Sequence, residues 1–290
     1  MTIDLTDPVF TDETKAREHL EAIRWPDGPV CPHCGSIDKV YRLSGKSHRP
    51  GLIHCNGCDG SFTVTTGSVM ESSHVPLNKW VLAFRLMASS KKGISAHQLH
   101  RTISVTYKTA WFMAHRIREA MRDAAPAPLG GEGAIIESDE AYWGSKDTDN
   151  ASMKRRRKGK PGPGGKSKIL TLVERGGRSR SLKMDDLRTE TVHRVLRENA
   201  STKSRLMTDE GTAHNFEFAS HEKVKHGAGE YARGDVTTNT VEGFFSVFKR
   251  GMRGTYQHCG EQHLQRYLDE FDFRYSTRHK PSPAQSPSAI

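Results

Sequence analysis

The sequence predicts a multidomain α/β protein, and three observations carry that prediction. Short β-type runs between residues 39 and 66 lie among two closely spaced pairs of cysteines. A helical period of apolar residues returns from Asn78. After Gly133, strand-like runs mix with helical ones, a pattern typical of an α/β domain. The chain of 290 residues is long enough for two or three such parts.

The N-terminal region, residues 1–30, predicts one amphipathic helix that begins at about Thr11. Ala16, Leu20 and Ile23 share a face of this helix, so we expect it to pack against the protein rather than bind a partner. Residues 31–74 then form a small ribbon. The runs KVYRL, GLIH and SFTVTTG, separated by Gly, Ser and Pro, predict its short hairpins.

Four of the five cysteines occur as Cys31-x2-Cys34 and Cys55-x2-Cys58. Two such pairs on adjacent hairpins predict a tetrahedral, structural Zn²⁺ site with four sulfur ligands. Two disulfides or a redox pair are the alternatives, but the absence of a signal peptide favours a reducing compartment. A closed site of this kind contributes to folding and leaves no position open for catalysis. Cys259 stands apart and is expected to be an inert thiol.

Residues 75–125 predict three helices with helix-turn-helix-like spacing. Ser95 and Thr106 are candidate N-caps of two helices separated by about one turn. In a helix-turn-helix the second helix enters the major groove and its first residues reach the bases. The candidate readers and phosphate contacts are Thr106, Tyr107, Lys108 and Trp111, followed by Arg116 and Arg118. The alternative is an ordinary three-helix bundle with Trp111, Phe112 and Ile117 in its core.

A Pro- and Gly-rich stretch at residues 126–132 predicts a linker, and a second domain spans residues 133–279. This domain begins with the strand GAIIESDEAYWG, and KILTLVERGGRSRSLKM predicts two more strands joined at Gly176 and Gly177. The helix TETVHRVLREN, the strand SRLMTDEG and two further helices, NTVEGFFSVFKRGM and GEQHLQRYLDEFDFRYSTR, follow. Residues 280–290 are rich in Pro and Ser and are expected to be disordered.

Carboxylates at strand ends are the candidates for chemistry in this domain. Asp139 lies on its first strand and Asp209 ends a later one, so the two can converge on a site for hard divalent cations. Glu242 could supply a third oxygen ligand from a helix. On that helix Asn239, Glu242, Ser246 and Lys249 share one face, whereas three phenylalanines face the core. Two cations at such a site catalyse phosphodiester displacement.

The stretches SDEAYWG, MTDEG and HGAGEYARGDVTTNTVEGFFSVFKRGMRGTY, with HLQRYLDEFDFRYSTR, resemble the insertion-sequence DDE transposases of the ISXO-like group. The resemblance covers about residues 10–278 and implies a zinc ribbon, a helical DNA-binding segment and an RNase H-like catalytic domain. It implies that Asp139, Asp209 and Glu242 are the catalytic acids, binding two Mg²⁺ or Mn²⁺ ions, and that Lys249 lies beside the substrate phosphate. Asn239 is the alternative third residue, because some members of the group are described with asparagine there.

Two more glutamates flank Asp139. Glu137 shares the strand face of Asp139 and could be an auxiliary ligand, whereas Glu140 is expected on the opposite face. A basic insert at residues 154–168 holds eight basic residues and no acid, and Arg155, Arg156, Arg157 and Lys158 within it are candidate phosphate contacts. The net charge of +10 likewise indicates a polyanionic partner.

The leading hypothesis is therefore a transposase of a bacterial insertion sequence, a mobile element, which binds terminal inverted repeats in double-stranded DNA and catalyses end cleavage and strand transfer. The alternatives are an inactive or domesticated DNA-binding regulator and a metal-dependent nuclease without strand transfer. The resemblance also implies a homo-oligomer on DNA. No apolar run approaches the roughly 18 residues of a membrane span, so we expect a cytoplasmic, nucleoid-associated protein without a membrane partner.

Overall fold

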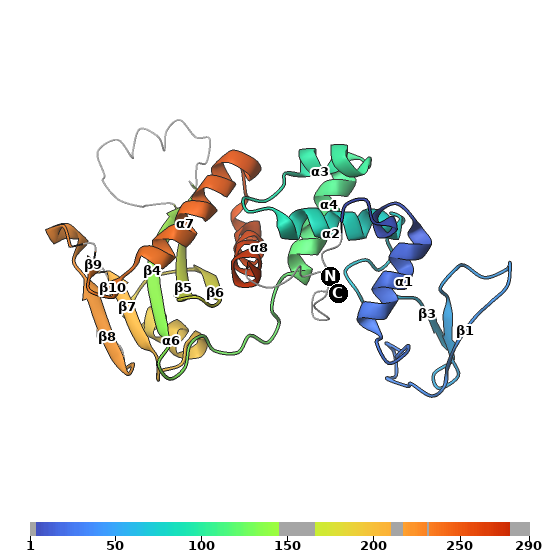
Figure 1. Cartoon of the computed structure of the whole chain (residues 1–290), viewed down its shortest axis with the longest axis horizontal. Helices are drawn as coiled ribbons and strands as arrows, with labels where there is room; N and C mark the ends of the chain where they lie inside the picture. Colours follow the sequence, from blue (N-terminus) through green and yellow to red (C-terminus); the bar gives the residue numbers. More distant parts are fainter. Residues whose placement is uncertain (1–3, 145–165, 210–216, 231, 279–290) are drawn as a thin grey trace. The chain divides into compact units, whose positions relative to one another are not determined.

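The computed structural model describes residues 4–144, 166–209, 217–230 and 232–278. The described chain divides into two compact units, residues 4–121 and residues 122–278. Figure 1 colours the chain from the N-terminus to the C-terminus, and its labels are used below. No helix in the described ranges is both long and apolar enough to cross a membrane.

Unit 1 begins with the 3-10 turn η1 (Pro8–Phe10) and helix α1 (Glu13–Arg24). The side chain of Asp12 caps α1 by accepting a hydrogen bond from the Lys15 backbone N–H at 2.9 Å, so the helix begins two residues later than predicted. A three-stranded antiparallel sheet follows, with β1 (Val40–Arg42), β2 (Ile53–Cys55) and β3 (Gly60–Phe62) in that order. These strands confirm the predicted hairpins.

The helical part of unit 1 contains α2 (Leu77–Ser89), α3 (Ala96–Ile103) and α4 (Tyr107–Ala120). Both predicted N-caps are confirmed, because the hydroxyl of Ser95 accepts from the Gln98 N–H and that of Thr106 from the Thr109 N–H. Ser104 ends α3 in the left-handed region, with φ 52°. This short, tight connection gives α3 and α4 the predicted helix-turn-helix-like spacing.

Unit 2 is built around a five-stranded mixed sheet in the order β6-β5-β4-β7-β8. Strands β4 (Ile135–Trp143), β5 (Ser167–Glu174) and β6 (Ser179–Met184) pair antiparallel, as two successive hairpins require. Strand β7 (Arg205–Asp209) then pairs parallel with β4, and β8 (Ser220–Val224) pairs parallel with β7. Neighbours among the first three strands are thus antiparallel, and two parallel strands follow on the other side of β4. This is the RNase H-like arrangement that the family resemblance implied.

Helices cover both faces of this sheet (Figure 1). One face packs on α6 (Thr189–Asn199), whose Val192 and Leu196 join Ile136 of β4 in one apolar cluster. The other face packs on α7 (Asn239–Gly251) and α8 (Leu264–Thr277), with Phe248 and Phe271 in a second cluster. Each fully buried side chain of this size contributes about 1.5–3 kcal/mol to stability. A π-helical turn, Met252–Tyr256, and the 3-10 turn Glu261–His263 connect the two helices.

Helix α8 also lies against strand β6 at the edge of the sheet. Its side chains bond the backbone groups that a sixth strand would otherwise use. The Ser181 N–H donates to Asp272 at 2.6 Å, and the Lys183 N–H donates to the side-chain oxygen of Gln265 at 2.8 Å. The amide of Gln265 donates in turn to the Ser181 carbonyl at 2.9 Å. The edge strand therefore has its outward backbone groups satisfied by a helix.

Two features of unit 2 have no counterpart in the sequence prediction. The hairpin β9 (Ala232–Arg233) and β10 (Val236–Thr237) precedes α7, and β8 adds the fifth strand. The stretch 126–132, predicted as a linker, contains Leu129, which is fully buried and bonds through its N–H to the Asn199 carbonyl at 2.9 Å. Leu129 thus packs as part of unit 2.

Candidate functional site

The three candidate acids come from three different elements of unit 2. Asp139 lies in β4, Asp209 ends β7, and Glu242 lies in the first turn of α7. Strands β4 and β7 are parallel, with Glu137 opposite Met207. Continuing this register by two residues puts Asp139 opposite Asp209, on the same face of adjacent strands. Asp139 lies in the middle of β4 and only Asp209 ends its strand, so the two acids approach through the register of adjacent strands and not through two strand ends.

The charges at this point of the sheet act on one another. The pKa of Asp139 is raised to about 6, mainly because the carboxyl is buried, while the N–H of Glu140 lowers it. The negative charges of Asp209 and Glu242 raise it further, and the ammonium of Lys249 lowers it. A carboxyl whose ionisation is disfavoured by two neighbouring carboxylates lies in a site that would gain from a bound cation. The charge of Asp139 is thus coupled to those of Asp209, Glu242 and Lys249, which with Asp139 are four of the five residues that the sequence selected.

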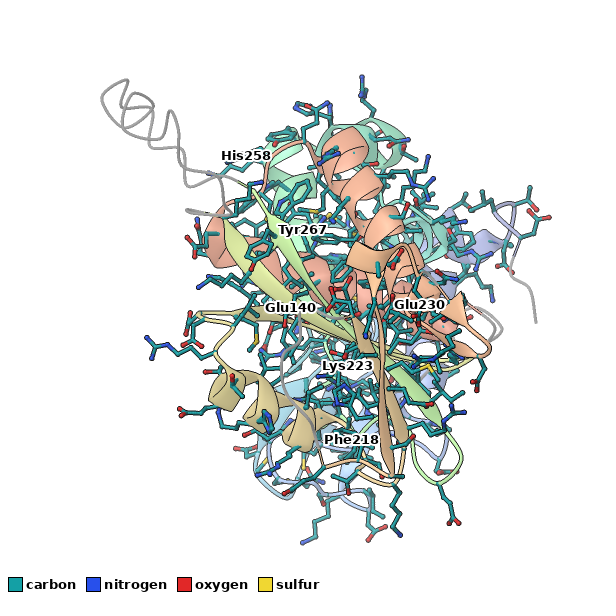
Figure 2. All side chains as sticks on the ribbon, turned by 90° about the vertical axis from the view of Figure 1, so that its left-hand side faces the viewer. Glu140, Phe218, Lys223, Glu230, His258 and Tyr267 are labelled. Atoms are coloured by element: carbon teal, nitrogen blue, oxygen red, sulfur yellow. The ribbon has the colours of Figure 1, made fainter. Side chains whose placement is uncertain are left out.

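Glu140 is also part of this charged cluster. Its backbone N–H donates to the Asp139 carboxylate at 2.7 Å. Its pKa is raised to about 7 by burial and by the charges of Asp209 and Asp139. Figure 2 labels Glu140 on β4, within the crowded centre of unit 2. Strand alternation predicted that Glu140 lies on the opposite face of the strand from Asp139. The charges of both aspartates nevertheless raise the pKa of its carboxyl.

Helix α7 presents the face that the sequence predicted. Asn239, Glu242 and Ser246 are exposed and Lys249 is half-buried, whereas Phe244, Phe245 and Phe248 are at most 3% exposed. The Lys249 ammonium lies 5.5 Å from the centroid of the Phe245 ring, which holds it beside the helix. The hydroxyl of Thr238 donates to the Glu242 carboxylate at 2.9 Å. Asn239 is the first residue of the helix.

Glu137 holds the start of α7 on the sheet. Its carboxylate is fully buried and accepts from the Thr240 N–H at 2.7 Å, the Thr240 hydroxyl at 2.8 Å and the Val241 N–H at 3.0 Å. It also accepts from the Arg175 guanidinium at 2.6 Å. A carboxylate at a helix N-terminus satisfies unpaired N–H groups and the helix dipole. These bonds engage the carboxylate on both oxygens, so Glu137 positions the helix and is not an auxiliary metal ligand.

Arg175, which donates to Glu137, also connects α7 and β4 to β7, the third element of the site. Its guanidinium donates to the carbonyls of Asp235 at 2.8 Å and Thr237 at 3.0 Å, just before α7, and it lies 3.2 Å from the sulfur of Met207 in β7. Glu137, Met207 and Thr240 each lie two residues before one of the three acids. We call Glu137 and Arg175 together the clamp. The clamp was not predicted, because Arg175 is in a turn and no sequence pattern marks it.

The four cysteines of unit 1 form the other candidate site. Their sulfur atoms all lie within 4.8 Å of one another, with Cys31 and Cys58 3.7 Å apart and Cys34 and Cys55 3.6 Å apart. A tetrahedral Zn²⁺ with bonds of about 2.3 Å requires sulfurs about 3.8 Å apart, so the spacing fits that ion. The five cysteines all lie among the described residues and none of them forms a disulfide, which argues against the disulfide alternative.

Comparisons with known proteins agree with this geometry. A family model described as the ISXO2-like transposase domain matches residues 128–276, and one described as the transposase zinc-ribbon domain matches residues 11–60. The chain belongs to the ISXO2-like transposases. The transposase is also 30% identical over 290 residues to an uncharacterised protein in transposable element ISH50 of Halobacterium salinarum. The match covers 94% of each chain, and its archaeal source gives no support to the predicted bacterial origin.

The residues of the transposase site fit the divalent cations that the family implies. Three carboxylates supply hard oxygen donors, and the pKa of Asp139 is raised mainly by burial and further by the charges of the other two. Among the described residues, one group of three or more metal-binding side chains has its ligand atoms within 4.8 Å of one another, and that group is the four cysteines. The three acids do not form such a group in this structure.

The structure of the transposase separates the candidate DNA contacts into exposed and enclosed residues. Thr106, Tyr107 and Lys108 are exposed at the start of α4, and the Tyr107 ring stacks on His97 with centroids 4.3 Å apart. Trp111 is half-buried. Arg118 is 2% exposed, which leaves its guanidinium without access to a phosphate in this structure. The ordinary-bundle alternative also fails in part, because Ile117 is buried but Phe112 is 54% exposed.

Arg116 and the basic residues of the insert are the remaining candidate phosphate contacts. Arg116 donates to the carbonyls of Val69 at 3.2 Å and Glu71 at 2.8 Å, so part of its donor set is engaged within unit 1. The basic residues Arg155, Arg156, Arg157 and Lys158 lie outside the described residues.

Proposed function

We propose that this chain is an active transposase that cleaves the ends of its element and joins them to target DNA. Two observations support this most directly: β4 and β7 pair in a register that continues to Asp139 and Asp209, and the charges of Asp209 and Glu242 both act on Asp139. An inert regulator would not need this costly arrangement of like charges. The presence of all three acids on the predicted elements therefore favours the enzyme over the regulator.

The three acids would hold two Mg²⁺ or Mn²⁺ ions. When bound, such ions activate the attacking water or hydroxyl and stabilise the leaving oxygen. The donor set is carboxylate oxygen, which these hard cations prefer. Lys249, half-buried on the same face of α7 as Glu242, would contact the substrate phosphate and balance its charge.

The reaction proceeds in two displacements at phosphorus. In the first, water attacks the phosphodiester at the element end, the bond from phosphorus to the 3′ oxygen breaks, and a 3′-hydroxyl and a 5′-phosphate result. In the second, that 3′-hydroxyl attacks a target phosphodiester, which forms a new bond and releases a target 3′-hydroxyl. Asp139, Asp209 and Glu242 orient the reacting groups in both steps, and α7 presents Lys249 to the phosphate.

The third acid is Glu242 in this proposal. Its charge raises the pKa of Asp139, and this coupling supports the choice of Glu242. Asn239 lies one helical turn earlier on the same exposed face. It would contact the DNA backbone or a bound water and has no charge with which to balance a cation.

The element ends are recognised by unit 1 in this proposal. The start of α4, with Tyr107 and Lys108 exposed, would enter the major groove, and the zinc ribbon would contact the adjacent backbone. The insert 154–168 would add phosphate contacts through its eight basic residues. Two ends must be held together for joining, so we expect a homo-oligomer on DNA.

The test is incubation of the purified protein with labelled duplexes that carry the inverted repeats flanking its gene, in Mg²⁺ or Mn²⁺. We expect joined products from the wild type, and neither cleavage nor joining from Asp139→Asn or Asp209→Asn, with end binding unchanged. Glu242→Gln should be inactive and Asn239→Ala should keep measurable activity.

Each other result selects an alternative. Nicks without joined products would indicate a nuclease, and binding without either product would indicate a regulator. Loss of DNA binding in the aspartate variants would contradict their assignment to chemistry. An inactive Asn239→Ala beside an active Glu242→Gln would reverse the choice of third residue.

A further inference from the structure

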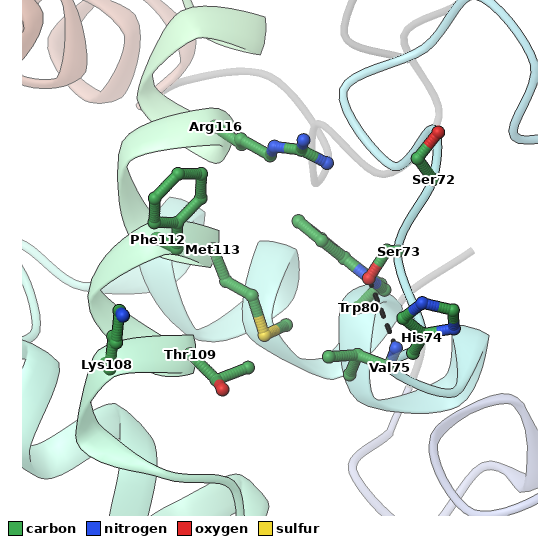
Figure 3. A pocket seen from close by; sticks show the side chains of 10 residues that line it. All are labelled: Ser72, Ser73, His74, Val75, Trp80, Lys108, Thr109, Phe112, Met113 and Arg116. Carbon is green, nitrogen blue, oxygen red and sulfur yellow. Dashed lines mark hydrogen bonds between the residues drawn. The ribbon is translucent and has the colours of Figure 1, made fainter.

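A cavity of about 330 Å³ opens beside α4 in unit 1, whereas the three acids belong to unit 2. In Figure 3, Lys108, Phe112, Met113 and Arg116 of α4 stand on one side of it, and Trp80 and His74 on the other. All the residues that line it belong to unit 1. Its volume is at the lower end of the range of small-ligand pockets, about 300–1,000 Å³.

The floor of the cavity is apolar and rigid. Trp80 and Met113 are at most 2% exposed. The indole N–H of Trp80 donates to the hydroxyl of Ser73 at 3.0 Å, and that hydroxyl also accepts from the Val75 N–H at 3.2 Å. These bonds fix the ring against the loop at residues 72–75 (Figure 3). The floor of the cavity is therefore apolar and already formed in this structure.

The mouth of the cavity combines an exposed aromatic ring with two cations. Lys108, Phe112 and Arg116 are spaced by four residues on α4, so they form one stripe. Phe112 is 54% exposed, and the Arg116 guanidinium lies 5.8 Å from the centroid of its ring. The two carbonyls that accept from Arg116 hold its guanidinium in place.

The chemistry of the lining selects the ligand. Among the described residues that line the cavity there are hydroxyls, an imidazole and two cations, but no carboxylate. A ligand that fits must be flat and aromatic, must carry a negative charge, and must have polar edges. A nucleotide has all three properties, since its base stacks on aromatic rings and its phosphate pairs with Lys or Arg.

We propose that this cavity receives one unpaired nucleotide of DNA, with its base against Phe112 and its phosphate between Lys108 and Arg116. The nucleotide must be unpaired because a base inside a duplex is stacked on its neighbours and hides its faces. This inference rests on the proposed function, in which the start of α4 binds the element end. It adds that the same helix holds a nucleotide displaced from that duplex.

The experiment compares two duplexes of the terminal inverted repeat, one blunt and one with a three-nucleotide single-stranded overhang that contains 2-aminopurine. Binding is followed by fluorescence anisotropy, and stacking by quenching of 2-aminopurine. We expect the wild type to prefer the overhang and to quench its fluorescence. Phe112→Ala should lose about 5- to 150-fold in affinity for the overhang duplex, the equivalent of one lost stacking contact, and less than about twofold for the blunt duplex.

Two matched variants keep the test specific. Phe112→Trp preserves an aromatic face at this exposed position and should keep the preference and the quenching, whereas Phe112→Leu should lose both. Thermal unfolding and bound zinc confirm that each variant is folded.

The proposal is overturned if Phe112→Ala weakens both duplexes equally or neither. It is also overturned if thymidine monophosphate alone binds as tightly as the overhang, which would assign the cavity to a free nucleotide. Wild-type binding to the blunt duplex separates these failures from failure of the proposed function, in which neither duplex is bound.

Discussion

Replacing Glu137 by glutamine tests whether the clamp holds the three acids together. The carboxylate is fully buried and accepts four hydrogen bonds, one of them from the Arg175 guanidinium. Glutamine keeps the shape but turns an amide N–H group towards donors, and it leaves Arg175 without its counter-charge. Removing one partner of a buried ion pair costs about 3–5 kcal/mol. In a domain the size of unit 2, that loss lowers the melting temperature by roughly 6–20 °C.

Calorimetry of the full chain measures this change, and hydrogen exchange of β4 and α7 peptides assigns it to unit 2. Glu198→Gln is the matched control, because Glu198 pairs with Arg194 at 3.5 Å on the exposed face of α6 and such a pair contributes at most about 1 kcal/mol. We also expect Glu137→Gln to weaken divalent-cation binding, about 10- to 100-fold, because a supporting residue is lost. If the melting temperature of Glu137→Gln equals that of Glu198→Gln, the clamp does not stabilise the site and our reasoning is wrong.

Two further predictions concern pH and metal. Burial raises the pKa of Asp272 to about 7 against the opposing hydrogen bonds from Ser179 and Ser181. The folded-state pKa exceeds the ordinary value of 3.8, so the stability contributed by the protonated carboxyl falls as pH rises from about 4 to 7 and is constant above. Asp272→Asn removes this pH dependence. In urea unfolding, the free energy of unfolding of the variant should therefore rise relative to that of the wild type between pH 5 and pH 8. An equal difference between the two proteins at both pH values would count against the raised pKa. Chelation of Zn²⁺, or Cys55→Ser, should unfold residues 31–62 while unit 2 keeps its transition in calorimetry. A ribbon that stays protected from hydrogen exchange after metal loss would contradict the structural role of the cysteines.

The elements that local signals specify were predicted well. Ser95 and Thr106 act as caps because a hydroxyl at the N-cap position needs only residues two or three further on. The exposed face of α7 followed from helical period, since the phenylalanines of that helix had to face the core. Strand β8 was missed because SHEKV is polar and mostly half-buried at the sheet edge, so it carries no alternation.

The candidate site divides in the same way. Asp209 could be selected because it ends a strand that is visible in the sequence, Asp139 because it lies on another such strand, and Glu242 because of its helix face. The family resemblance supported all three choices. The role of Glu137 could not be predicted, because its partners at residues 240 and 241 are over 100 positions away. Strand alternation correctly put Glu137 on the face of Asp139, but only the position of α7 decides that it caps a helix. Long-range contacts of this kind leave no mark in local pattern.

The helix that covers strand β6 also bears on aggregation. An uncovered edge strand offers a row of free N–H and C=O groups to any other extended chain, and fibrils grow by such pairing. Gln265 and Asp272 of α8 block that row in this protein. A copy of the gene truncated before α8 would therefore encode an aggregation-prone polypeptide that precipitates or is degraded. It would not encode a folded, inactive DNA-binding fragment. Loss of α8 would thus cause aggregation of the protein as well as loss of its activity.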